Sequence, residues 1–212
     1  MVPIKSANTT IHYNTITGYS RAIELREGSD ESVIMRNFFD NNGVGIFIRS
    51  NGHTISENTF LGSDVLDGGS SSGIYIDSQP SPANTTIFLN IFDNISDPLF
   101  DGGAGNIWSG IVDMGTSNVT LGNFYAEYHT DQQLRRGYRC TDINFDNICD
   151  REYLFDTFAE DQYPLRSRGM REASNFYNSP VVEPIADIAV REVEGAHVFI
   201  NATSPSSLQL TY

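Results

Sequence analysis

Ile55-Ser56-Glu57-Asn58-Thr59-Phe60 is one copy of the pattern that decides the fold: an apolar residue, two or three residues, Asn, one residue and another apolar residue. Copies occupy residues 11–16, 34–39, 55–60 and 87–92, and their asparagines lie 23, 21 and 32 residues apart. A period of roughly 20 to 50 residues is typical of stacked repeats, in which each repeat covers the apolar face of its neighbour. The pattern therefore predicts coils whose asparagines align at the bends and bond one another: Asn14, Asn37, Asn58 and Asn90.

A second pattern, in which apolar and polar side chains alternate, lies between these copies at residues 22–25, 45–50 and 73–78. Alternation with a period of two is typical of a strand with one buried face. Coils of about 22 residues with two or three short strands predict an all-β fold, a right-handed, single-stranded parallel β-helix. We expect a capped C-terminal end, a short β-strand extension and a loop at residues 62–72, which are rich in Gly and Ser.

The charge of the chain argues against two classes of partner. The 212 residues include 13 Lys and Arg against 27 Asp and Glu, a net charge of -14. This charge repels phosphate backbones and anionic lipid surfaces, so no nucleic acid is expected as a partner. No apolar run approaches the roughly 20 residues of a membrane span, which predicts no membrane insertion. Residues 1–6 lack the apolar core of a signal peptide, so any export signal is expected outside this sequence.

The strongest local signal for a binding site is residues 140–150, CTDINFDNICD. Counted from Asp142, oxygen-bearing side chains occupy positions 1, 3, 5 and 9, which is the spacing with which a tight loop wraps a hard cation. The backbone carbonyl at position 7 adds a ligand. Asn147 stands where Gly is usual in such loops, and Tyr153 where a bidentate Glu is usual. An acidic turn without an ion is the alternative. We predict a calcium cofactor held by Asp142, Asn144, Asp146, Ile148 and Asp150.

The two cysteines of the chain, Cys140 and Cys149, bracket this loop. Their spacing predicts a local disulfide, a bond of oxidising compartments, so the expected location is extracellular or at the cell surface. Zinc is a weaker alternative because two thiols without a His at ligand spacing do not complete a zinc site. Five Asn-x-Ser/Thr sequences are predicted glycosylation acceptors: Asn8, Asn84, Asn94, Asn118 and Asn201.

Residues 8–110 resemble the parallel β-helix repeat family of archaeal and bacterial surface proteins, which includes carbohydrate-binding and sugar-hydrolase-type β-helices. Relatives include polysaccharide lyases and hydrolases, and the periplasmic protein that helps to mature the copper site of nitrous oxide reductase. The resemblance implies a fold and leaves the function open, because this architecture carries lyases, adhesins and viral tailspikes alike.

Residues 100–165 resemble the acidic terminal module of archaeal β-helix surface proteins, which run N-x-W-N, G-G-N-Y-W-x-D-Y, D-x-D-x-D-G-I-G-D-x-x-Y and D-x-Y-P-L. The corresponding motifs lie at residues 106–108, 122–128, 142–153 and 161–165, and the resemblance implies that Asp142, Asn144, Asp146 and Asp150 take the places of the acidic loop. Phe124-Tyr125 replaces Tyr-Trp, Glu127 replaces Asp, and Asn147 replaces Gly. Aromatic residues are expected to cap the open end of the helix: Trp108, Phe124, Tyr125, Tyr128, Tyr153 and Tyr163.

The sequence changes character at Pro180. Residues 181–203 alternate around a Glu-Gly turn and resemble the opening strands of an immunoglobulin- or cadherin-like domain. Two or three strands cannot bury a sandwich core, so they are expected to belong to a longer domain or to pair with a strand edge in this or a neighbouring chain. The predicted organisation is β-helix coils at 1–110, a terminal module with the acidic loop at 111–165, a linker at 166–180 and partial immunoglobulin- or cadherin-like strands at 181–212.

The predicted function is an extracellular structural or adhesive β-helix module of a cell-surface, matrix or filament protein, stabilised by calcium. Its expected partners are other copies or envelope proteins, bound through the C-terminal strands. The alternative is a protein that binds or degrades polysaccharide (a lyase or glycoside hydrolase), which needs paired carboxylates across a groove. A copper chaperone is not supported, because the four His are scattered and there are only four Met. We predict no catalytic residue. The candidate carboxylates for a glycosidase are ordinary turn residues: Asp64, Asp67, Asp77, Asp93, Asp97 and Asp101. A lyase would also need a basic residue, and Arg49 is the only strand-borne option.

Overall fold

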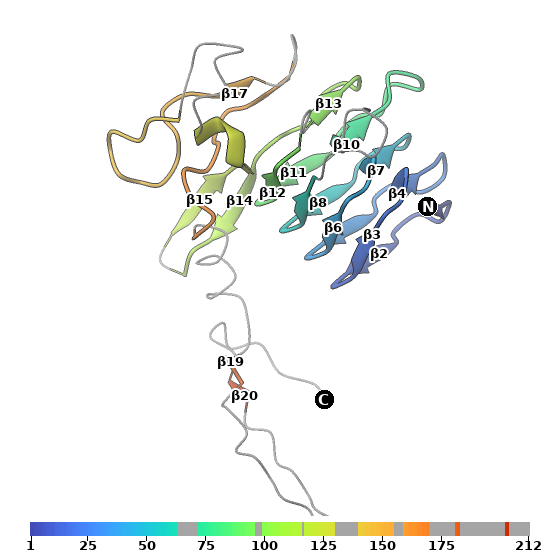
Figure 1. The fold of residues 1–212 in the computed structure, drawn as a ribbon, viewed down its shortest axis with the longest axis horizontal. Helices are drawn as coiled ribbons and strands as arrows, with labels where there is room; N and C mark the ends of the chain where they lie inside the picture. Colours follow the sequence, from blue (N-terminus) through green and yellow to red (C-terminus); the bar gives the residue numbers. More distant parts are fainter. Residues whose placement is uncertain are drawn as a thin grey trace, which may run out of the picture.

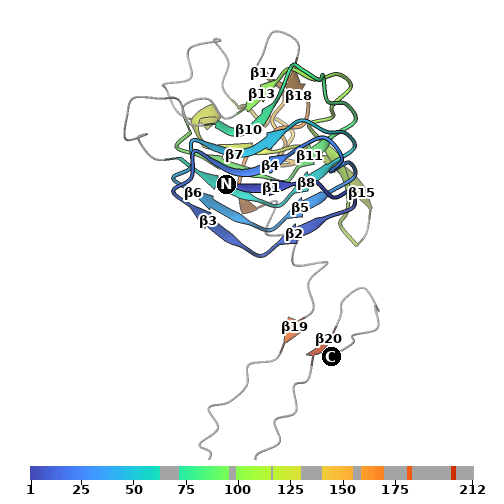
Figure 2. The ribbon, with the colours of Figure 1, turned by 90° about the vertical axis from the view of Figure 1, so that its right-hand side faces the viewer.

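The computed structural model describes residues 1–62, 72–95, 99–115, 117–129, 140–154, 159–169, 181–182 and 202–203. Short strands follow one another around three faces of the molecule, and each pairs in parallel with the strand of the next coil. Figures 1 and 2 show these coils side by side, from the blue N-terminal coil to the green coils.

Three parallel sheets form the faces. Equivalent residues are in register from coil to coil, so that Ile34 lies opposite Ile55, and Ile55 opposite Ile87. The predicted parallel β-helix is therefore confirmed. Sheet A contains β1 (Val2–Ile4), β4 (Arg21–Leu25), β7 (Val44–Ile48), β10 (Ser72–Ile76) and β13 (Leu99–Asp101); sheet B contains β2 (Thr10–His12), β5 (Val33–Met35), β8 (Thr54–Ser56) and β11 (Thr86–Phe88); sheet C contains β3 (Thr15–Thr17), β6 (Phe38–Asp40), β9 (Thr59–Leu61), β12 (Ile91–Asp93) and β16 (Phe124–Tyr125).

The core consists of ladders of like side chains. In sheet C, the rings of Phe39, Phe60 and Phe92 stack with centroids 4.8 and 5.0 Å apart, and Tyr125 continues the stack at 5.3 Å. Parallel pairing places each side chain about 4.8 Å from its equivalent in the next coil, so every ring covers its neighbour. Sheet A contributes a second, aliphatic ladder that is likewise buried: Ile23, Ile46, Ile74 and Leu99.

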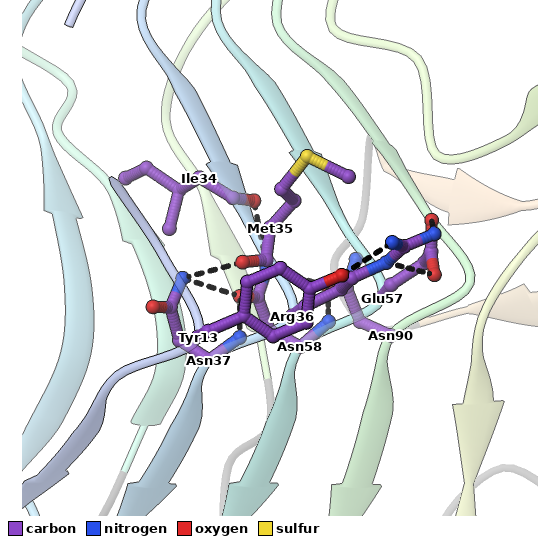
Figure 3. Close-up of polar contacts among 8 residues, drawn as sticks. All are labelled: Tyr13, Ile34, Met35, Arg36, Asn37, Glu57, Asn58 and Asn90. Carbon is purple, nitrogen blue, oxygen red and sulfur yellow. Dashed lines mark hydrogen bonds and ion pairs between the residues drawn. The ribbon is translucent and has the colours of Figure 1, made fainter. Parts of the chain in front are cut away.

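The predicted asparagine ladder lies at the bend between sheets B and C (Figure 3). Each side-chain amide nitrogen donates to the amide oxygen of the next coil, at 3.0 Å from Asn14 to Asn37, 3.0 Å from Asn37 to Asn58 and 3.1 Å from Asn58 to Asn90. The backbone N–H of the same residue donates to the same oxygen. The predicted alignment is thus confirmed, and all the donors face the C-terminal end of the helix.

The residue before each ladder asparagine has a left-handed backbone, with φ of 55° at Tyr13, 56° at Arg36, 57° at Glu57 and 56° at Leu89. In the first three coils the side chains of this column contact one another outside the bend (Figure 3). Arg36 Nε donates to Glu57 at 2.9 Å, and Arg36 Nη1 donates to the Tyr13 hydroxyl at 2.6 Å. An outer ladder of polar contacts therefore accompanies the buried one.

Elements outside the three sheets cover the C-terminal end. They are the antiparallel pair β14 (Gly110–Asp113) and β15 (Asn118–Leu121), the 3-10 helix η1 (Ala126–His129), and the antiparallel pair β17 (Tyr153–Leu154) and β18 (Glu160–Asp161). Tyr163, one of the aromatic residues predicted to cap this end, is 38% exposed, but the other five are buried: Trp108, Phe124, Tyr125, Tyr128 and Tyr153. The described part of the tail is the antiparallel pair β19 (Val181–Val182) and β20 (Ala202–Thr203).

Candidate functional site

The asparagine ladder continues beyond Asn90 and ends on a carboxylate. Asn90 Nδ2 donates to Asn123 Oδ1 at 2.9 Å, and the backbone and side-chain nitrogens of Asn123 donate to Asp161 Oδ2 at 2.7 and 3.1 Å. The Tyr125 hydroxyl donates to the same oxygen at 3.1 Å, and the Tyr163 N–H donates to Asp161 Oδ1 at 3.0 Å. Because every step of the ladder presents N–H donors toward this end, a carboxyl group, whose oxygens accept hydrogen bonds, completes it.

Sequence reasoning missed Asn123 and Asp161 as members of the ladder. The available signal was residues 121–125, Leu-Gly-Asn-Phe-Tyr, which keep an asparagine between apolar residues. Asp161 begins the D-x-Y-P-L motif at residues 161–165, but nothing in that motif indicates that its carboxylate reaches the ladder. It reaches the ladder through the β17–β18 pair, and a Cβ at Gly122 would collide with its carboxylate.

Burial controls the protonation of this ladder end. It raises the pKa of the fully buried Asp161 to about 7 from an ordinary 3.8, although four hydrogen bonds donated to the carboxylate act in the opposite direction. Burial also raises the pKa of Tyr125 well above 10, and the neighbouring Asp161 carboxylate raises it further. The tyrosine therefore stays protonated and acts as a donor.

The predicted metal loop is a closed turn whose carboxylates bond its own backbone. Asp142 accepts from the N–H groups of Asp146 and Asn147, both at 3.1 Å. Asp150 accepts from the N–H of Ile143 at 2.9 Å, and Asp146 accepts from the N–H of Ile148 at 2.8 Å. The remaining side chain of the predicted set, Asn144, donates to Asp146 at 2.9 Å.

A disulfide joins Cys140 to Cys149 at the base of this loop. Cys149 is buried and packs against the core of the helix. The loop is therefore fixed to the capped end by a covalent bond as well as by hydrogen bonds.

Replacing both cysteines by Ala is expected to lower the free energy of unfolding by about 2–3 kcal/mol, because closing a loop of this size restricts the unfolded chain by that amount. Urea denaturation of the variant and the wild type measures the change. Reduction of the wild type serves as the control, since it breaks the bond without removing sulfur volume. If neither treatment shifts the midpoint, the disulfide does not hold the cap.

The described carboxylates that were considered for polysaccharide hydrolysis each have a structural contact. Asp77 pairs with Arg49 at 2.9 Å, beside β7 and β10 of sheet A. Asp93, on sheet C, pairs with Arg168. Asp101 accepts from Trp108 Nε1 at 3.0 Å and from an amide nitrogen, Asn106 Nδ2, at 2.8 Å. The remaining candidates lie outside the described residues: Asp64, Asp67 and Asp97.

A cavity of about 330 Å³ lies next to Asp101 at the capped end. Its charged side chains are both acidic, Asp101 and Glu160, and Gln162 Nε2 donates to Glu160 at 3.0 Å. The complete lining is Asp101, Gly103, Gly105, Asn106, Ile107, Trp108, Ser109, Ala159, Glu160 and Gln162.

Most of the predicted glycosylation acceptors are on the surface. Asn8, Asn84, Asn94 and Asn118 are exposed, and Asn201 lies outside the described residues. In the described part of the chain, no helix has the length and apolar character that crossing a bilayer requires.

The stacked parallel coils, the buried asparagine ladder and the covered C-terminal end define the class of protein as a capped parallel β-helix. Residues 3–130 match the sequence profile of the family described as periplasmic copper-binding protein (NosD). This match covers more than half of the 212 residues, and the chain belongs to that family. Comparisons with curated proteins and with solved structures found no match.

The predicted calcium cofactor is wrong. The family is described as copper-binding, and among the described residues no three or more His, Cys, Asp or Glu side chains are grouped so that they could hold a metal ion. The physical reason lies in the acidic loop, where Asp142, Asp146 and Asp150 accept hydrogen bonds from nearby backbone N–H groups. Asp and Asn are favoured in turns for these same bonds, so the spacing alone does not distinguish a turn from a cation site.

The described residues do not fit a copper centre either. Cys140 and Cys149 are joined in the disulfide, and both ring nitrogens of His53 have hydrogen-bond partners, the Ser32 N–H at 3.2 Å and the Ser50 hydroxyl at 2.8 Å. Burial lowers the pKa of His53 to about 4. His12 and Met35 face each other in the register of β2 and β5, but two donors are fewer than the three or four that copper sites commonly use.

Proposed function

We propose that this chain is an extracytoplasmic structural or adhesive β-helix module of a cell-surface, matrix or filament protein. The observation that carries the proposal is the use of the buried polar groups. Within the described residues, Thr85 Oγ1 is the one buried side-chain polar atom without a hydrogen-bond partner. Catalytic groups have to be available to a substrate, whereas these polar groups bond one coil to the next.

The compartment follows from two observations. The family description names the periplasm, and the chain contains a disulfide, which persists in oxidising compartments. Fractionation of the cells that produce the chain, combined with a thiol-reactive mass tag, tests the proposal. We expect the chain in the periplasmic or surface fraction, with no tag until it is reduced. A cytosolic chain with two reactive thiols would refute an extracytoplasmic module.

The C-terminal strands provide the proposed route of assembly. Their alternating sequence supports an immunoglobulin- or cadherin-like continuation, and the described part of this segment is the antiparallel β19–β20 pair. We propose that residues 181–212 bind other copies or envelope proteins. Truncation after residue 180 is the test, because it should abolish such assembly and leave the β-helix folded.

A second candidate function, saccharide binding, is supported by the cavity beside Asp101. Its volume falls within the range of small-ligand pockets, and its carboxylates and amides can accept and donate hydrogen bonds to hydroxyl groups. Affinity electrophoresis in gels that contain neutral or acidic polysaccharides tests this candidate. The candidate is supported if the wild type is retarded and Gln162→Ala removes the retardation. Asn51→Ala, at an exposed site in the N-terminal half, is the control and should leave the retardation unchanged. Equal mobility in every gel would reject it.

A further inference from the structure

The disulfide loop displays two large apolar side chains to solvent. Ile143 is 79% exposed and Phe145 is 83% exposed, the highest values among the exposed large hydrophobic residues of the described chain. The loop, gold at the left edge of Figure 1, stands away from the stacked strands. Two exposed apolar side chains, two residues apart on a projecting loop, offer an apolar surface that another molecule can bury.

The aromatic side chain at position 145 buries little of its surface in the fold. Phe145 has a left-handed backbone with φ of 61°, a conformation that Gly and Asn adopt far more readily than an aromatic residue. Its ring has no core to pack against, because most of it faces solvent. This residue choice therefore indicates a role outside the folding of the chain.

The loop holds these side chains in a fixed arrangement. The Cys140–Cys149 disulfide closes its base, and the Asp142 carboxylate accepts hydrogen bonds from the backbone N–H groups of Asp146 and Asn147. The loop is also tied to the neighbouring segment, since Cys149 N donates to Pro164 O at 2.8 Å and Arg166 N donates to Asn147 O at 2.9 Å. A preorganised loop loses little entropy when it binds, which favours its use as an anchor.

We propose that Ile143 and Phe145 anchor this loop in an apolar socket of another protein, and that Lys or Arg residues form the rim of that socket. Asp146 and Asp150 are exposed on the same loop, and the cation that the structure places beside the loop, Arg166, lies 4.0 Å from the buried Asp142 carboxylate. A basic rim is complementary to these carboxylates, whereas an anionic bilayer, or the same acidic loop of a second copy, repels them. This inference rests on the proposed adhesive function, and it identifies the surface through which the chain would make that contact.

Photo-crosslinking from the loop tests the proposal. The full chain is produced in its own cells with a benzophenone amino acid at position 145, and at position 111 as a control. Ile111 is 73% exposed on β14, so it matches the loop in exposure but not in shape or charge. We expect position 145 alone to crosslink to one protein, at a residue that lines an apolar socket with basic neighbours. Crosslinks to lipid, to glycan or to a second copy, or a pattern equal to that from position 111, would overturn the proposal.

Binding of the purified pair provides the second arm. We expect Phe145→Asn to weaken binding by at least roughly 30-fold, as for other central anchors, and to leave the thermal midpoint equal or higher because the left-handed strain is relieved. Asp146→Lys should slow association at low salt, and Ile111→Asn should change neither quantity. Unchanged affinity of the Phe145→Asn variant would overturn the proposal. A chain found reduced in the cytosol would refute the proposed extracytoplasmic function, whereas the affinity of the purified, oxidised pair tests the anchor separately.

Discussion

Replacing Asn90 by Ala is expected to lower the free energy of unfolding by about 3–5 kcal/mol, because it interrupts the buried ladder at its centre. Asn90 Oδ1 accepts from the backbone and side-chain nitrogens of Asn58 at 3.0 and 3.1 Å, and its Nδ2 donates to the carbonyls of Ile55 and Phe88 and to Asn123. Asn58, Asn90 and Asn123 are all 0% exposed, so water cannot replace the lost partners. Each buried donor or acceptor left without a partner costs about 1–3 kcal/mol.

The control for this prediction is Asn51→Ala. Asn51 also bonds across coils, to the Asp30 carboxylate and to the N–H of Ala83, but it is exposed and water can take the place of its side chain. We expect a loss below about 1 kcal/mol for this variant. Chemical denaturation followed by circular dichroism measures both changes. Similar losses for the two variants would show that the ladder stabilises the fold no more than a surface turn does.

The sequence predicts the ladder from Asn14 to Asn90, because there each asparagine recurs once per coil within the same apolar pattern. From Asn14 to Asn90, each asparagine sits between a strand of sheet B and a strand of sheet C, and the repeat is visible in the chain itself. At Asn123 the preceding strand, β15, pairs in a hairpin instead of joining sheet B, so the coil pattern is broken. Asp161 lies 38 residues further along, and its motif at residues 161–165 does not indicate the tertiary contact that brings it to Asn123.

The acidic loop shows why its chemistry could not be predicted from spacing. Carboxylates at alternate positions suit both a cation site and a turn in which side chains accept backbone N–H groups. The choice depends on which way each oxygen points, and that direction is set by the folded backbone, including the left-handed residues Phe145 and Asn147. The exposure of Phe145 was equally hidden, since an aromatic residue in a sequence normally indicates a core position.

The largest expected effect of pH belongs to Asp161. Its pKa is about 7 in the folded chain against an ordinary 3.8, so the folded state binds this proton more tightly than the unfolded state. The contribution of Asp161 to stability is therefore fully present below about pH 4, falls as the pH rises through the window between the two values, and is lost above about pH 7. A difference of about three pKa units corresponds to a change on the order of 4 kcal/mol across that window.

Substituting Asp161 by Asn isolates this contribution, because the amide keeps the shape of the carboxylic acid and does not titrate. His53 acts in the opposite direction, since its pKa is lowered to about 4 and its contribution is lost as the pH falls below about 6.5. The difference between the wild type and the Asp161→Asn variant cancels the effect of His53. We expect the wild type to exceed the variant in stability at pH 5, and this advantage to shrink by several kcal/mol by pH 8.

Denaturation at pH 5, 6, 7 and 8 measures that difference, and Asp113→Asn, at an exposed position on β14, controls for the loss of one carboxylate. A constant difference between the wild type and the Asp161→Asn variant would mean that the carboxylate keeps the same charge in the folded and unfolded chains. The four hydrogen bonds donated to Asp161 would then outweigh its burial, and the ladder would end on a permanently ionised group. A shrinking difference would instead show that protonation of one buried carboxyl adjusts how firmly the cap closes the helix.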